Sequence, residues 1–374
     1  MTTNKKVSVK TCRIGELFCG PGGFGHAADM AATGKIYNGT KYKIEHLWAN
    51  DVDPNACATY AENFKKISPN LKVIPGDIKN VDFDELKNQG DINGLTFGFP
   101  CNDFSIVGKQ KGLDGHFGPL YKYGIEALET FAPDWFIAEN VGGIRSANDG
   151  EALFKILREL ESTRKVKYKI TPHYYKFEEY GVPQKRHRVI IVGINSEIGK
   201  TFKVPAPTIR SADNYMKVRD ALRGIPGDAE NHERTRQSKK VEERLKIILP
   251  GNNIWETELP EYLQLKVKGA RLSQIYRRLH PEQPAYTITG SGGGGTHVYH
   301  HEEFRALTNR ERARLQTFDD TFVFKGSKES VRKQIGMAVP PRGVQKIIEA
   351  VFMTIEGVEY DSVAPYFDLS DGEE

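Results

Sequence analysis

The chain has 374 residues, a hydrophobic content of 39% and a formal net charge of +4, which provides enough apolar material for two domains or for one large α/β unit with an insertion. It has no apolar run long enough to cross a bilayer, and it starts without the apolar core of a secretory signal, which argues against membrane and secreted proteins. The four cysteines, Cys12, Cys19, Cys57 and Cys101, show no metal-ligand spacing and no CxxC motif, so we expect no metal site, no disulfide framework and a cytoplasmic location.

In the first half of the chain, short apolar runs alternate with helix-like segments. The runs are 14–18, 44–49, 71–74, 94–99, 135–138 and 189–193. Helical patterns lie between several of them, for example at 54–64 and 151–162. This alternation predicts an α/β fold with a doubly wound, mostly parallel sheet, in which ligands bind beyond the carboxyl ends of the strands.

The second half has a different character. Strand patterns fade from about residue 197, so we predict a catalytic and cofactor-binding domain at 1–196, a smaller irregular domain at 197–320, and a C-terminal segment at 321–374 that packs back on the first domain through a helix at 343–355. Thr308 and Glu311 form a predicted capping box. Residues 201–280 include 16 Lys and Arg and 10 Asp and Glu. This positive excess fits a nucleic-acid-binding surface and a solvated face equally well.

A cysteine and a carboxylic acid follow two of the predicted strands. Pro100 and Cys101 come after the run at 94–99, and Glu139 comes after the run at 135–138. The ends of parallel strands share one edge, so thiol and carboxyl are expected to lie close together, as for a nucleophile and a proton donor. A free cysteine is more often a small buried hydrophobic residue, and the nearby carboxyl favours the first interpretation.

Three earlier strand ends are suited to an adenosine. The sequence Gly-Pro-Gly-Gly-Phe-Gly at 20–25 fits the G-x-G-x-x-G pattern of dinucleotide sites, although a tight turn without a ligand also fits it. Asp51 ends the second strand, where a carboxylate accepts hydrogen bonds from ribose. Asp77 and Ile78 follow the third strand. Each acidic residue is alternatively a helix cap, which is the favoured interpretation for Asp53 before Pro54.

Eight sequence blocks, in order, resemble the DNA (cytosine-5)-methyltransferase family. They include Glu-Leu-Phe-Cys-Gly-Pro-Gly-Gly-Phe at 16–24, Pro-Cys-Asn-Asp-Phe-Ser at 100–105, Glu-Asn-Val at 139–141 and Tyr-Gly-Val-Pro-Gln-Lys-Arg-His-Arg at 180–188. The others lie at 50–51, 76–78, 307–314 and 334–340. The resemblance covers nearly the whole chain except 197–270.

The resemblance implies a methyltransferase fold and S-adenosyl-L-methionine as cofactor, and it makes 197–320 a target-recognition domain. The implied cofactor residues are Phe18, Gly20, Gly22, Gly23, Phe24, Asp51, Asp77, Ile78 and Pro100. The implied catalytic residues are Cys101, Glu139, Arg186 and Arg188. Contacts to DNA are expected from Ser105, Asn140, Gln184, Gly292, Gly293 and Gly294, because a glycine loop lets a DNA backbone approach closely.

Further expectations concern the arginines and two departures from the family pattern. Arg186 and Arg188 alternate in one predicted strand, so both side chains are expected to face the same side of it. There they either hold a base or a phosphate, or they form ion pairs on an exposed strand. Met337 stands where the family usually has Asn, and its side chain does not offer the same hydrogen bond to a cofactor. Asn102 stands where Gln is common, which is a milder change.

The mechanism that the resemblance implies begins with a cytosine flipped out of double-stranded DNA, since a stacked base does not reach the sheet edge. The Cys101 thiolate adds to C6, Glu139 assists at N3, and C5 becomes nucleophilic. We expect a monomer in the bacterial cytosol, without membrane contact, paired with a restriction endonuclease. The alternatives are the tRNA-methylating branch, disfavoured by the missing Cys-Phe-Thr tripeptide, a nicotinamide oxidoreductase, and a non-catalytic DNA-binding protein.

Overall fold

The computed structural model describes residues 7–99, 120–145, 151–265 and 272–367. The chain forms two compact units. Unit 1 comprises 1–176, 187–207 and 343–374, and unit 2 comprises 177–186 and 208–342. The segment 177–186 therefore belongs to unit 2, although the sequence alone placed it inside the first domain. Within the described residues, no helix combines the length and the apolar character that a bilayer span needs.

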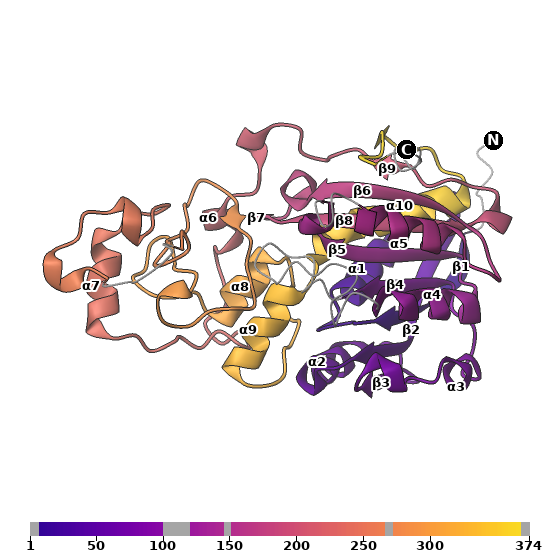
Figure 1. The fold of residues 1–374 in the computed structure, drawn as a ribbon, viewed down its shortest axis with the longest axis horizontal. Helices are drawn as coiled ribbons and strands as arrows, with labels where there is room; N and C mark the ends of the chain where they lie inside the picture. Colours follow the sequence, from indigo (N-terminus) through magenta and orange to yellow (C-terminus); the bar gives the residue numbers. More distant parts are fainter. Residues whose placement is uncertain (1–6, 100–119, 146–150, 266–271, 368–374) are drawn as a thin grey trace. The chain divides into compact units, whose positions relative to one another are not determined.

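Unit 1 is built on a seven-stranded sheet in the order β3-β2-β1-β4-β5-β8-β6 (Figure 1). The strands are β1 (Ser8–Leu17), β2 (Thr40–Asp51), β3 (Lys72–Pro75), β4 (Gly94–Gly98), β5 (Trp135–Val141), β6 (Tyr168–Lys176) and β8 (His187–Asn195). The first five run parallel to one another, whereas β8 is antiparallel to both β5 and β6. The predicted α/β fold with a mostly parallel sheet is confirmed.

Helices cover both faces of this sheet. They are α1 (Gly23–Ala32), α2 (Pro54–Phe64), α3 (Phe83–Lys87), α4 (Tyr121–Phe131), α5 (Glu151–Glu161) and α10 (Pro341–Glu356). On β5, Trp135 meets Phe352 of α10 in an edge-to-face contact, whereas the next residue, Phe136, lies in the buried cluster that includes α4 and α5. Successive residues of a strand point to opposite faces, so α10 lies on one side and α4 with α5 on the other.

Strand β6 is the element of the sheet that the sequence did not predict. Its residues alternate poorly between apolar and polar, and Pro172 lies in its middle. Proline has no backbone N–H to donate to a neighbouring strand, which argues against a central strand at this position. The structure accommodates Pro172 because β6 is the last strand of the sheet and pairs only with β8.

Unit 2 contains little regular structure. Its helices are α6 (Val218–Ala221), α7 (Lys239–Ile247), α8 (Asn309–Leu315) and α9 (Lys328–Met337), and its strands β7 (Gln184–Lys185) and β10 (Ala285–Tyr286) form one short parallel pair. The predicted capping box is confirmed, because the Thr308 hydroxyl accepts from the Glu311 N–H at 3.2 Å and the Glu311 carboxylate accepts from the Thr308 N–H at 2.8 Å. Two small apolar clusters provide the core of this unit.

Candidate active site

The glycine loop after β1 is held against the end of β2. The Cys19 N–H donates to the Asn50 carbonyl at 3.0 Å, and the Gly20 N–H donates to Asp51 Oδ2 at 2.8 Å. Gly22 has a φ of +101°, and a Cβ there would lie 2.3 Å from the Phe64 ring. Only glycine adopts this positive φ without strain and also lacks the Cβ that would clash with the ring. The loop therefore turns sharply into α1, which begins at Gly23.

The aromatic residues that flank this loop have different environments. Phe18 is half-buried and has a φ of +54°, a backbone region that few residues other than glycine adopt. Phe24 is 5% exposed, and its ring lies 3.9 Å from the position of a Cβ built on Gly98 at the end of β4. The loop thus presents one half-buried ring, and it packs the other ring toward β4.

The ends of β2 and β3 are joined by hydrogen bonds. The Asn50 side-chain amide donates to the carbonyls of Ile74 and Gly76 at 2.9 and 3.1 Å, and the Gly76 N–H donates to the Asp51 carbonyl at 2.9 Å. Asp51 also accepts from the Asp53 N–H at 2.8 Å. The first three strand ends therefore form one connected edge, as the sequence predicted.

Two aspartates near this edge cap the N-terminus of a helix and of a short 3-10 turn. Asp53 accepts from the Asn55 N–H at 3.0 Å and caps α2, which confirms the favoured interpretation of Asp53. Asp77 accepts from the Lys79 N–H at 3.0 Å. Ile78 is 4% exposed and lies in the main cluster of unit 1. Asp77 and Ile78 thus have structural roles in addition to the cofactor contacts proposed for them.

The ends of β4 and β5 carry the second part of the site. The Asn140 side-chain amide donates to the carbonyl of Phe99, the last described residue before Pro100, at 3.2 Å. Glu139 forms an ion pair with Arg188 of β8, with 2.8 Å between Oε1 and Nε, and both side chains are about 14% exposed. The predicted residues Pro100, Cys101 and Ser105 lie outside the described residues.

Gly98 leaves room for the second oxygen of Glu139. A Cβ built on Gly98 would lie 3.2 Å from Glu139 Oε2, which is closer than most real contacts of such an atom. The ion pair with Arg188 engages Oε1. One oxygen is thus fixed by Arg188 while the other faces the end of β4.

The prediction that Arg186 and Arg188 share one strand is wrong. Arg186 lies between β7 and β8, its N–H donates to the Gln184 carbonyl at 3.0 Å, and it belongs to unit 2. Its guanidinium is buried and donates to the carbonyls of Ile288 and Met337 at 3.1 and 3.4 Å. The local turn breaks the strand pattern, so the two side chains do not alternate on one pleat.

Gln184 is fully buried in unit 2. Its amide nitrogen donates to the Leu315 carbonyl at 3.2 Å and to Gln316 Oε1 at 2.9 Å, and its oxygen accepts from the Ile288 N–H at 2.8 Å. All these partners are protein groups. In this structure the side chain therefore organises unit 2, and a contact between Gln184 and DNA requires these bonds to change.

A second Gly-rich loop, at residues 290–295 of unit 2, is anchored at one end on α9. A Cβ on Gly336 would lie 2.0 Å from the Gly290 nitrogen and 2.1 Å from the Thr289 carbonyl carbon, so two backbones touch. Gly293 faces open space, and Gly292 has a φ of +153°. Gly294 begins a short 3-10 turn. The middle of the loop is therefore free of neighbouring backbone, whereas its start is not.

The Gly336→Ala substitution is expected to lower the free energy of unfolding by about 1–3 kcal/mol, because an added methyl group must displace a backbone that does not yield as a side chain does. Chemical denaturation measures this change. The matched control is Met337→Ala on the same helix, whose side chain is 66% exposed and whose loss should change stability by less than about 0.5 kcal/mol. Equal losses would contradict the backbone contact.

A buried polar chain that the sequence did not reveal lies behind the glycine loop. The Tyr60 hydroxyl contacts Glu16 Oε2 at 3.1 Å and His46 Nδ1 at 3.2 Å, and His46 Nε2 lies 3.2 Å from both oxygens of Asp29. Glu16 Oε1 is buried, and no described residue forms a hydrogen bond with it. Burial raises the pKa of the Glu16 carboxyl well above its usual range. The one feature of the sequence that pointed to this buried chain was the position of Glu16, a carboxyl near the end of an apolar strand.

A raised pKa of Glu16 gives stability a defined pH dependence. Below about pH 4.5, the ordinary value, the carboxyl is protonated in both the folded and the unfolded chain. As the pH rises from there toward the folded-state pKa, only the unfolded chain ionises, so the free energy of unfolding falls. The Glu16→Gln substitution should flatten this decline in denaturation curves recorded across pH. An unchanged pH slope would show that Glu16 is not protonated in the folded state.

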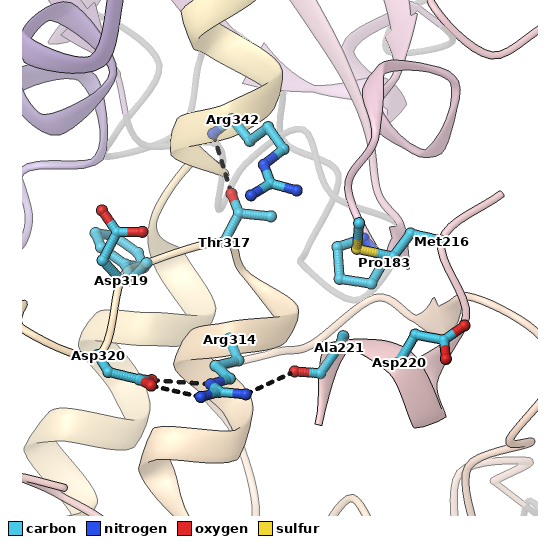
Figure 2. A pocket seen from close by; sticks show the side chains of 10 residues that line it. Pro183, Met216, Asp220, Ala221, Arg314, Thr317, Asp319, Asp320 and Arg342 are labelled. Atoms are coloured by element: carbon cyan, nitrogen blue, oxygen red, sulfur yellow. Dashed lines mark hydrogen bonds and ion pairs between the residues drawn. The ribbon is translucent and has the colours of Figure 1, made fainter. Parts of the chain in front are cut away.

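A hollow of about 340 Å³ in unit 2 contains none of the predicted site residues (Figure 2). Three carboxylates line it, from Asp220, Asp319 and Asp320, and the last is paired with Arg314 at its floor. Thr317, with a φ of +67°, is fixed there by the Arg342 N–H, which donates to its hydroxyl at 3.0 Å. Arg314 and Arg342 also line the hollow, so its carboxylates outnumber its cations by one, and this balance does not favour a polyanion.

Comparisons with known proteins agree with this geometry. The family model of C-5 cytosine-specific DNA methylases matches residues 12–353. The Type II methyltransferase M.BbvI of Brevibacillus brevis is 55% identical over 96% of this chain and 95% of its own length, and M.NgoFVII of Neisseria gonorrhoeae is 39% identical over 82% and 80%. An E. coli prophage protein described as a DNA modification methyltransferase shares the fold, with a TM-score of 0.69 and 22% identity over 92% and 99% of the two chains.

Proposed function

Since this chain belongs to the family of C-5 cytosine-specific DNA methylases, we propose that it methylates C5 of a cytosine within one specific duplex sequence, with S-adenosyl-L-methionine as the methyl donor. The coarser activity is shown by the comparisons: the chain is a DNA (cytosine-5)-methyltransferase of the restriction-modification type. The proposal adds the cofactor, the covalent route and the roles of individual residues.

The edge formed by the first three strands fits S-adenosyl-L-methionine. A Cβ built on Gly20 has no atom within 4 Å, so the loop leaves open space beside the carboxylate of Asp51 and the half-buried ring of Phe18. An aromatic ring suits adenine, and a carboxylate suits ribose hydroxyls. Gly22, Gly23 and Phe24 would shape the loop, and Asp77, Ile78 and Pro100 would complete the site. The cofactor supplies an electrophilic methyl group on a sulfonium.

The nucleophile of the proposed reaction is Cys101. Cytosine C5 is a weak nucleophile within an aromatic ring, so the ring needs activation. Addition of the Cys101 thiolate to C6 forms a carbon–sulfur bond and makes C5 enamine-like. After methylation of C5, loss of the C5 proton to a base and expulsion of Cys101 restore the aromatic ring. The thiol is thus regenerated at the end of each turnover.

Glu139 and Arg188 would act on the cytosine ring during this addition. Negative charge develops on the ring as the thiolate attacks, and a hydrogen bond or proton at N3 stabilises it. Arg188 fixes Glu139 Oε1 at 2.8 Å, and Oε2 lies 3.2 Å from the position of a Cβ built on Gly98 at the end of β4. This arrangement orients the carboxyl toward the end of β4, which leads into Pro100 and Cys101. Arg186 is proposed to hold the base carbonyl or a phosphate.

The substrate is proposed to be a cytosine flipped out of double-stranded DNA, with unit 2 providing most of the target recognition. Ser105, Asn140, Gln184 and Gly292 to Gly294 remain the proposed DNA contacts. We further propose that the protein works as a monomer in the bacterial cytosol, without a membrane partner, and protects DNA from a paired restriction endonuclease.

One observation carries this proposal most directly. Adjacent residues near the end of β5 support the proposed site, because Glu139 is held by Arg188 and Asn140 fixes the carbonyl of Phe99, two positions before Cys101 in the sequence. A rigid link between the strand that carries the acid and the strand that leads to the thiol is what a shared reaction centre needs.

Bisulfite sequencing of DNA from a host that expresses the chain tests the proposal, because it reports both the chemistry and the target sequence. We expect 5-methylcytosine at one recurring sequence. Incubation with labelled cofactor and either duplex DNA or tRNA separates the proposal from the tRNA-methylating branch. Label in tRNA alone, or none in either substrate, would contradict it.

A further inference from the structure

A second cavity in unit 2, of about 280 Å³, is lined by cationic and neutral side chains. The residues that matter are Lys185, Asn252, Arg277, Arg278, His280 and Tyr286, and we call this cavity the basic pocket. No Asp or Glu side chain is among its described lining residues. It therefore differs from the hollow of Figure 2, which three carboxylates line, and it is suited to an anion.

The walls of the basic pocket are fixed by hydrogen bonds. Tyr286 of β10 pairs with Lys185 of β7 in a parallel register, so both side chains lie on the same face, and the Thr287 hydroxyl donates to the Lys185 carbonyl at 2.7 Å. The Arg278 guanidinium, 4% exposed, donates to five carbonyls at 2.6–3.2 Å. This arginine is structural, and it adds a fixed positive charge.

Arg277 and Lys185 differ from Arg278 because their charged groups are not engaged. The Arg277 guanidinium lies 5.0 Å from the centre of the Tyr286 ring, and it has neither an acceptor nor an ion-pair partner among the described residues. The Lys185 ammonium likewise has no carboxylate partner in the part of the chain that the structure describes. Two cations without a carboxylate partner among the described residues thus line the basic pocket, and the ring of Tyr286 orients the Arg277 guanidinium.

We propose that the basic pocket holds one phosphodiester of the DNA backbone, bound by Arg277 and Lys185. The inference rests on the proposed function, which supplies duplex DNA as the ligand. A planar guanidinium and an ammonium are the two groups that bind phosphate oxygens best, through a fork and through a point charge. Such a contact positions the duplex without selecting a base. Arg277 and Lys185 are therefore positioning residues, and they do not set the recognition sequence.

The test uses Arg277→Gln, Lys185→Gln and the double variant of the full chain, with the duplex that the unmodified chain methylates. DNA affinity is measured as a function of salt. Each single variant should weaken binding about tenfold, and the double variant should reduce the slope of log K against log salt by about 0.9, the value for one phosphate. The rate at saturating DNA and the methylated sequence should not change.

The matched control is Lys240→Gln, which removes an exposed cation of α7 outside the pocket and should leave the salt slope unchanged. Arg277→Lys, which keeps the charge, should retain the slope even if the Gln variant unfolds. The proposal would be overturned if the double variant had the same salt dependence of DNA binding as the unmodified chain. It would also be overturned if Lys240→Gln reduced that salt dependence as much as the double variant does.

A chemical probe identifies the ligand independently. Single phosphates of the duplex are replaced, one at a time, by uncharged methylphosphonates. At one position the replacement should weaken binding of the DNA to the unmodified chain. At that same position it should not weaken binding to Arg277→Gln any further, since the two changes remove the same contact. Additive effects at every position would overturn the proposal. Competition by inorganic phosphate without this coupling would indicate a free-phosphate site and would also overturn it. Absence of methylation by the unmodified chain would instead defeat the proposed function.

Discussion

Replacing Cys101 with Ala is expected to lower the rate of methyl transfer by about 10⁴-fold or more, a loss typical of removing a covalent nucleophile. Without the thiolate, no bond forms to cytosine C6, and C5 does not become nucleophilic. DNA binding should persist, because phosphate contacts supply most of the affinity. The measurement is the single-turnover incorporation of labelled methyl groups into duplex DNA by the variant and the unmodified chain.

The other cysteines provide matched controls. Cys12 lies inside β1 at 2% exposure, and burial raises the pKa of its thiol to about 12, so it is unreactive near neutral pH and Cys12→Ala should keep full activity. Cys57 is the sharper control, because a hydrogen bond with Cys19 lowers the pKa of its thiol. If Cys57→Ala abolished methylation while Cys101→Ala did not, the nucleophile would be misassigned.

A mechanism-based trap adds a readout that stability does not affect. A duplex with 5-fluorocytosine at the methylated position lacks the C5 proton that must leave, so the adduct with the nucleophile should accumulate. Mass spectrometry of the digested complex should place the modified base on the peptide that contains Cys101. Turnover without any adduct would contradict the covalent route.

Local signals in the sequence predicted the first unit well. The helix at 54–64 was predicted to the residue, because Asp53 and Pro54 form a strong helix start and the structure shows Asp53 as the cap. The apolar runs that lead to Asp51, Phe99 and Glu139 were also predicted as strands, since a continuous apolar run is typical of a buried parallel strand. The predicted end at 138 was too early, because β5 continues through Glu139 to Val141. These features depend only on neighbouring residues.

Features that depend on pairing between distant segments were not predictable. Glu139 faces Ile190 in the antiparallel register of β5 and β8, and Arg188 is two residues from Ile190, so it lies diagonally across from Glu139 on the same face. A parallel placement of β8 would have removed this contact. The burial of Gln184 also depends on α8, which is more than 120 residues away in the chain.

Replacing Glu139 with Gln is expected to lower the rate of methyl transfer by about 10²- to 10⁴-fold, the range for loss of a general acid. The amide retains the size of the carboxyl and one hydrogen-bond donor, but it does not deliver a proton to N3. The loss should fall on the chemical step, so affinity for DNA should change little. Single-turnover rates and equilibrium binding, measured on the same preparation, separate these two effects.

Arg188→Met examines the partner of the same ion pair. Removing the guanidinium leaves the Glu139 carboxyl, which is 14% exposed, without the ion pair that holds one of its oxygens at 2.8 Å. The carboxyl should then lose its fixed orientation, and the rate of methyl transfer at saturating DNA should fall by about 10- to 100-fold, the cost of misplacing a catalytic group by about 1 Å. Single-turnover rates measure this loss, and combining Arg188→Met with Glu139→Gln should add little to the loss caused by Glu139→Gln alone, because the two changes disturb the same contact. If the losses of the two variants were simply additive, the ion pair would not act through Glu139, and Arg188 would have a separate role.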